Sequence, residues 1–79
     1  MGIIAERITK SRKELGLNQK ELAKKANLTE ANLSRYENGV REPKSAVLAR
    51  LADALEVSTD YLVGLTDEKT YDSYDVGKK

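Results

Sequence analysis

Residues 17–39 read LNQKELAKKANLTEANLSRYENG, and they carry signals for two short helices and the turn between them. Asn18 and Thr29 are both good N-cap residues, and Glu21 completes a variant of the capping box three residues after Asn18. These signals predict helices at about 19–26 and 30–38. Because about three residues separate the two helices, they must cross steeply and cannot stack as an antiparallel hairpin.

Two residues suit this corner between the helices. Ala23 is small enough to allow close approach of the second helix. Asn27 stands where the turn needs a left-handed backbone, which Asn tolerates better than other residues apart from Gly. Small helical bundles of many kinds contain such a corner, so the spacing alone does not separate a DNA-binding motif from an ordinary bend.

Three further helices are expected outside the corner. A helix at about 3–15 is ended by Gly16 and carries an inward stripe formed by Ile4, Ile8 and Leu15. A helix at 45–56 shows apolar residues at i, i+3, i+4 and i+7, namely Leu48, Leu51, Ala52 and Leu55. Ser58 caps a last short helix at 59–64. The sequence therefore predicts an all-α chain of five helices.

The residue types that are missing from the composition limit the possible functions more than the net charge does. The net charge is +1, which argues neither for nor against a nucleic-acid partner. The chain has no Cys and no His, so thiolate ligands and the commonest general base are missing. We expect no enzymatic activity, no metal and no cofactor. No apolar run is long enough to span a membrane and no signal peptide is seen, so a cytoplasmic protein is expected.

Residues 17–39 resemble the helix-turn-helix of the Cro and phage-repressor family, also called the xenobiotic-response-element family of bacterial regulators. The resemblance covers roughly residues 3–65 and includes REP at 41–43 and VSTDYLVG at 57–64. It implies a compact, five-helix, lambda-repressor-like DNA-binding domain over residues 1–65, encoded by a bacterium or a phage. In that family the second helix of the corner enters the major groove. The chain departs from the family pattern at Asn27, where Gly is usual.

The resemblance also implies a set of DNA contacts around the helix at 30–38. Base contacts are expected from Glu30, Ala31, Asn32 and Arg35. Backbone contacts are expected from Gln19, Ser34, Asn38, Arg41 and Lys44. Arg suits the two acceptors of guanine, Asn suits the donor and acceptor of adenine, and Ala can pack on a thymine methyl. The alternative is that this helix face is simply solvated.

Arg12 needs a partner because it falls on the inward stripe of the first helix, where an unpaired cation is costly. Glu37, on the inner side of the third helix, is the expected partner, and similar proteins pair an Arg and a Glu at these two places. We predict a charge-assisted hydrogen bond that fixes the first helix against the third. The alternative is that Arg12 extends to solvent.

The function implied is a transcriptional regulator, in the repressor class, that binds a pseudo-palindromic operator in double-stranded DNA as a homodimer. The last helix offers apolar residues for dimerisation or for the core: Tyr61, Leu62, Val63 and Leu65. Residues 66–79 are expected to be a polar, flexible tail. A second hypothesis is an interaction module or antitoxin whose Tyr71 and Tyr74 dock on a protein partner; a plain linker is the alternative for the same segment.

Overall fold

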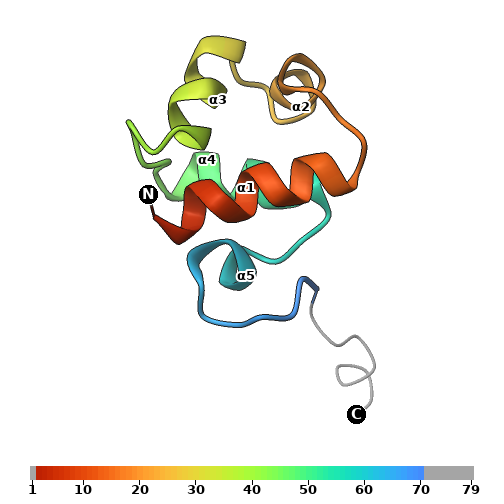
Figure 1. Ribbon diagram of the computed structural model, residues 1–79, viewed down its shortest axis with the longest axis vertical. Helices are drawn as coiled ribbons and strands as arrows, with labels where there is room; N and C mark the ends of the chain where they lie inside the picture. The colour runs from red at the N-terminus through yellow and green to blue at the C-terminus, as the bar shows by residue number, and fades with distance from the viewer. Residues whose placement is uncertain (1, 71–79) are drawn as a thin grey trace.

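The computed structural model describes residues 2–70, and five helices account for most of this range (Figure 1). They are α1 (Ile3–Glu14), α2 (Gln19–Lys25), α3 (Glu30–Glu37), α4 (Ser45–Leu55) and α5 (Thr59–Val63). The described residues contain no strand, which confirms the all-α prediction. Each helix begins at the predicted residue and ends one residue earlier, because the predicted last residue is its C-cap.

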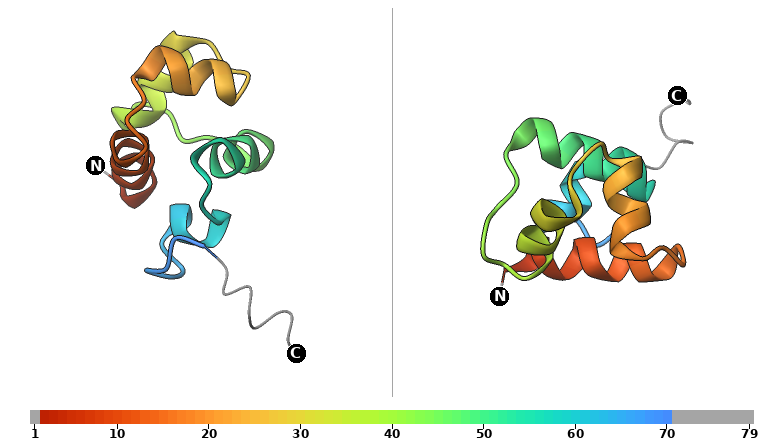
Figure 2. Two further views of the ribbon diagram at one scale, coloured as in Figure 1. Left: turned by 90° about the vertical axis from the view of Figure 1, so that its right-hand side faces the viewer. Right: turned by 90° about the horizontal axis from the view of Figure 1, so that it is seen from above.

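The corner between α2 and α3 is built by the local signals found in the sequence. The Asn18 side chain accepts from the Glu21 amide at 2.7 Å, and the Glu21 side chain accepts from the Asn18 amide at 2.8 Å. Thr29 Oγ1 caps α3 by accepting from the Asn32 amide at 3.1 Å. Asn27 has a φ of 58°, so it supplies the left-handed residue of the turn. α2 and α3 lie together at one end of the molecule, with α5 at the other (Figures 1 and 2).

The core lies where α1, α4 and α5 meet the inner sides of α2 and α3. Its largest fully buried side chains are Ile8, Leu22, Leu33, Leu51, Leu55 and Leu62. Leu15 was expected on the inward stripe of the first helix, but it is 40% exposed. Leu15 is the C-cap residue, where the chain already turns toward Gly16. The last buried residue of α1 is Ser11, one turn earlier. Among residues 2–70, no helix has the length and apolarity needed to span a membrane.

The end of α4 is marked by a backbone conformation that is rare for residues other than glycine. Glu56 adopts a left-handed conformation with a φ of 62° and terminates α4 as its C-cap. Ser58 then caps α5 by accepting from the Tyr61 amide at 3.0 Å. A non-glycine residue in this conformation carries a steric cost, so Glu56 is a locally strained position.

Residues 66–70, called the strap below, lie against α1 even though the sequence assigned them to the tail. Arg7 donates to the Thr66 carbonyl and to Asp67 Oδ1, the latter at 2.8 Å. Lys69 pairs with Glu14 near the other end of α1. Residues 71–79, including the two tyrosines proposed for partner docking, lie outside the described residues.

Two of the four apolar residues expected to serve either a dimer interface or the core lie in the core. Tyr61 is 3% exposed and Leu62 is fully buried. The Arg7 guanidinium lies 4.3 Å from the centre of the Tyr61 ring and covers it. Two apolar side chains remain at the surface of α5 and the residues after it. Val63 is half-buried and Leu65 is 77% exposed.

Candidate nucleic-acid interface

α3 presents one polar face to solvent and buries the other. Its buried residues are Leu33, Tyr36 and Glu37. The outer face contains all the residues of α3 and its C-cap that were predicted to contact DNA: Glu30, Ala31, Asn32, Ser34, Arg35 and Asn38. Asn32 and Ser34 are half-buried and the other four are exposed. The helix therefore offers donors, acceptors and a methyl group on a single side, as a groove-reading helix requires.

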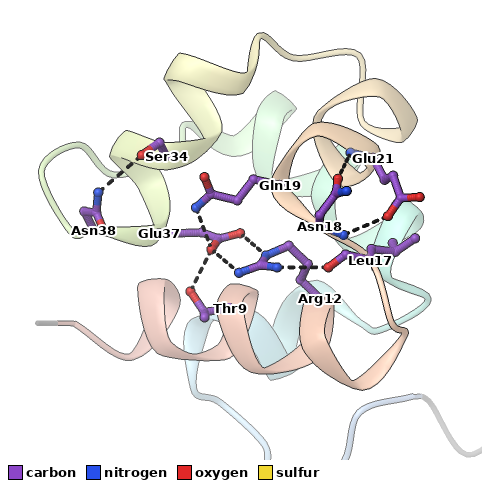
Figure 3. A network of polar contacts seen from close by, with 9 residues as sticks. All are labelled: Thr9, Arg12, Leu17, Asn18, Gln19, Glu21, Ser34, Glu37 and Asn38. Atoms are coloured by element: carbon purple, nitrogen blue, oxygen red, sulfur yellow. Dashed lines mark hydrogen bonds and ion pairs between the residues drawn. The ribbon is translucent and has the colours of Figure 1, made fainter.

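Two hydrogen bonds link side chains along this outer face. Arg35 Nη1 donates to Asn32 Oδ1 at 3.0 Å. Asn38 Nδ2 donates to Ser34 Oγ at 3.3 Å (Figure 3). These bonds lie between residues three and four apart, which are neighbours on a helix surface.

Behind α3, Glu37 joins three helices through a network of polar contacts (Figure 3). Its carboxylate accepts from Arg12 Nε at 2.8 Å and from Arg12 Nη2 at 3.1 Å. Thr9 and Gln19 also donate to it, at 3.2 Å and 3.1 Å. The predicted Arg12–Glu37 ion pair is thus present, with side chains that are 13% and 3% exposed. This pair stabilises α1 and the start of α2 against α3.

Arg12 also donates through Nη1 to the Leu17 carbonyl at 2.9 Å, between α1 and α2. Its guanidinium therefore has protein partners on both terminal nitrogens and on Nε. That arrangement satisfies a nearly buried cation and ties the loop before α2 into the same network.

Gln19 is predicted to contact the DNA backbone, and in the structure its side chain also bonds a protein residue that the sequence did not indicate. Its Nε2 donates to Glu37, so the side chain is held toward the network. Gln19 and Asn38 line one surface hollow of about 680 Å³ between α1 and the facing ends of α2 and α3. Lys10 and Lys13 of α1 line the same hollow, and no pattern in the sequence singles them out. The two lysines can be connected with the candidate DNA-binding surface only in the folded chain, where α1 lies beside Gln19 and Asn38.

Arg41 and Lys44 lie in the loop between α3 and α4, and both are exposed. The backbone amides of Val40 and Arg41 donate to the Arg35 carbonyl at 3.0 and 3.3 Å, so the loop is anchored to the end of α3. Pro43 is buried and holds the middle of the loop against the protein. Two cations, Arg41 and Lys44, therefore follow α3 on a fixed backbone, where they can contact phosphates.

Arg50 of α4 supports the corner between α2 and α3, and no sequence motif identifies it. Its Nε donates to the Ala26 carbonyl at 3.0 Å, at the C-cap of α2. A cation is favoured there because the carbonyl groups at a helix C-terminus lack partners within the helix. No local pattern links Arg50 to Ala26, since they are 24 residues apart.

The described residues contain no group of three or more acidic, His or Cys side chains that could hold a metal ion. The arrangement around α3 is instead one of hydrogen-bond donors and cations on a rigid frame. Such a surface is suited to contacting base edges and phosphates.

Comparison with known proteins agrees with this geometry. Residues 8–62 match the family model described as "Helix-turn-helix". The chain is 41% identical over 61 residues to the HTH-type transcriptional regulator ImmR of Bacillus subtilis (strain 168), covering 77% of this chain and 48% of ImmR. It thus spans about half the length of that relative.

Two solved structures are similar over most of the chain. The P22 c2 repressor in complex with a synthetic operator has a TM-score of 0.75 and 33% identity, covering 80% of this chain and 96% of that one. The SinR protein in its complex with the SinI protein has a TM-score of 0.75 and 30% identity, covering 92% of this chain and 72% of that one. The chain therefore belongs to the helix-turn-helix family of the Cro and phage-repressor type.

Proposed function

We propose that this chain is a sequence-specific, double-stranded DNA-binding transcriptional regulator that acts as a repressor and reads the major groove with α3. The observation that carries the proposal is the exposed polar face of α3, in a fold shared with the P22 c2 repressor bound to its operator. The proposal places the protein in the cytoplasm, at the nucleoid, and includes no enzymatic activity.

The proposed base contacts are Glu30, Ala31, Asn32 and Arg35 on the outer face of α3. Arg35 is the strongest of these, because a guanidinium can donate two hydrogen bonds to O6 and N7 of guanine. The proposed backbone contacts are Gln19, Ser34, Asn38, Arg41 and Lys44. The Glu37 network supports this arrangement by holding α1 and α2 against α3, so little ordering of the frame is needed on binding.

The Arg35→Ala variant tests this proposal. If Arg35 reads guanine, the variant loses about 1 to 3 kcal/mol of discrimination at one base pair. Lys69→Ala is the matched control, because it removes one positive charge from the strap, at the end of the molecule away from α3. Fluorescence anisotropy with a preferred duplex and its single-base variants measures both. Equal weakening on every duplex would show that Arg35 contacts phosphate alone.

We propose further that two copies bind DNA as a homodimer, with half-sites about one helical turn apart. Val63 and Leu65 remain as apolar residues for such an interface, since Tyr61 contributes to the core. Sedimentation equilibrium of wild type and Leu65→Lys tests this, because a charge at a 77% exposed apolar position disrupts an interface without touching the core. A monomer at concentrations that saturate the DNA would contradict the dimer.

A protein partner is the second candidate function, and the likeness to SinR in its complex with SinI favours it. The segment proposed to bind is 71–79, which continues from the strap. Loss of residues 71–79 should abolish capture of such a partner and leave DNA binding unchanged. If DNA binding falls instead, the segment belongs to the DNA-binding function.

A further inference from the structure

The hydrogen bond between Arg35 and Asn32 restricts what each residue can offer to DNA. A guanidinium has donors and no acceptor, so the Asn32 atom that faces Arg35 Nη1 at 3.0 Å must be the carbonyl oxygen. The two amide hydrogens of Asn32 therefore point away from Arg35. The Asn32 backbone is fixed as well, because its amide donates to the N-cap hydroxyl of Thr29 at 3.1 Å.

This geometry constrains how Asn32 meets a base. A free Asn side chain presents a donor and an acceptor together, which matches N7 and N6 of adenine. The Asn32 oxygen has two lone pairs and Arg35 Nη1 occupies one of them, so Asn32 keeps both amide donors and one acceptor position. The free donors match acceptors on a base edge, such as thymine O4, guanine O6 and N7, or adenine N7.

The same bond leaves Arg35 able to read guanine. One of its five N–H donors is used by Asn32, and Nη2 and Nε retain theirs. A long, exposed arginine loses rotamer freedom when it is fixed on a base, and this loss lowers affinity. A guanidinium already held by its neighbour loses less freedom on binding.

We propose that Asn32 and Arg35 read DNA as a coupled pair. Asn32 positions the guanidinium on a guanine and itself donates to an acceptor on a neighbouring base pair. This proposal rests on the proposed function and specifies how two residues of α3 act together in selecting bases. Asn32 is thereby a positioning residue for Arg35 as well as a base contact.

The test compares Asn32→Ala and Asn32→Asp with wild type on the duplex that wild type prefers and on all its single-base variants. Both variants are expected to fold, because the Asn32 side chain has no buried partner in the core. In Asn32→Ala, discrimination should fall at two base pairs, and at the guanine by about three- to tenfold. Asn32→Asp keeps an acceptor for Arg35, so it should keep the guanine preference while its neighbouring preference shifts toward cytosine, whose N4 donates.

Asn38→Ala is the matched control, since Asn38 caps the same helix, bonds Ser34 and is proposed to contact phosphate. It should weaken binding to all duplexes by the same factor. If Asn32→Ala relaxes a single base pair and leaves the guanine preference unchanged, the coupled reading is overturned. Loss of the guanine preference in Asn32→Asp also overturns it. If wild type prefers no duplex at all, the proposed function itself fails, and the coupled reading fails with it.

Discussion

The Glu37→Gln substitution removes the carboxylate charge from the network that joins α1, α2 and α3. In the native protein this carboxylate accepts four hydrogen bonds, from Thr9, Gln19 and twice from Arg12. Three of the four reach the same oxygen, Oε1. An amide carries an NH₂ group in place of one oxygen, so at least one donor of the network would face another donor.

The expected loss of stability follows from the burial of the pair. Removing one partner of a buried ion pair costs about 3–5 kcal/mol, because the other charge is left unpaired. Arg12 is 13% exposed and keeps its bond to the Leu17 carbonyl, so the lower end of the range applies, about 3 kcal/mol. A domain of this length has a free energy of unfolding of about 4–12 kcal/mol. The loss corresponds to a fall in Tm of roughly 12–24 °C.

Urea unfolding followed by far-ultraviolet circular dichroism measures this loss. Glu30→Gln is the control, because Glu30 is an exposed carboxylate on the same helix, and it should stay within about 0.5 kcal/mol of wild type. The double variant Arg12→Met, Glu37→Leu should recover most of the stability, since no buried charge remains. Wild-type stability in Glu37→Gln would show that the ion pair does not hold the helices together.

Four further outcomes are expected. Glu56→Gly should raise the free energy of unfolding by about 0.5–1 kcal/mol in urea titrations, because it relieves a left-handed non-glycine residue; lower stability would contradict this. Thr29→Ala should lower it by about 1 kcal/mol by removing the α3 cap. The Lys69 hydrogen bond lowers the pKa of Glu14 below its ordinary value of 4.5. The pair therefore stabilises the protein above pH 4.5, and this contribution is lost as the pH falls through the lowered pKa. Lys69→Met should therefore raise the pKa of Glu14 in an NMR titration. With about four phosphates neutralised per protomer, a DNA-bound dimer should show a log–log salt slope near −7.

The helices were predictable because their signals are local. Asn18 and Thr29 mark the starts of α2 and α3 by side-chain oxygens that reach amides three residues on. Asn27 was recognised as the left-handed residue because the turn needs one and Asn tolerates it. The Arg12–Glu37 pair was also predictable, since a cation on an inward helix face requires a partner.

What the sequence could not provide depends on contacts between distant residues. The strap was assigned to the tail because its polar sequence lacks periodicity, but it is placed by Arg7 and Glu14 of α1, more than fifty residues away. The sequence does not show whether Tyr61 lies at the surface or in the core, because the Arg7 guanidinium that covers its ring comes from a distant helix. The Asn32–Arg35 bond is local, yet a pattern of residue types does not show which side-chain atoms meet.

Whether α3 reads a specific DNA sequence can be measured by a binding selection from randomised duplexes at near-physiological salt. The pool uses duplexes of about 30 base pairs, long enough for two half-sites one helical turn apart. If α3 reads DNA in a dimer, the selection enriches two inverted half-sites with that spacing. A folded protein that enriches no sequence would show that α3 does not read one.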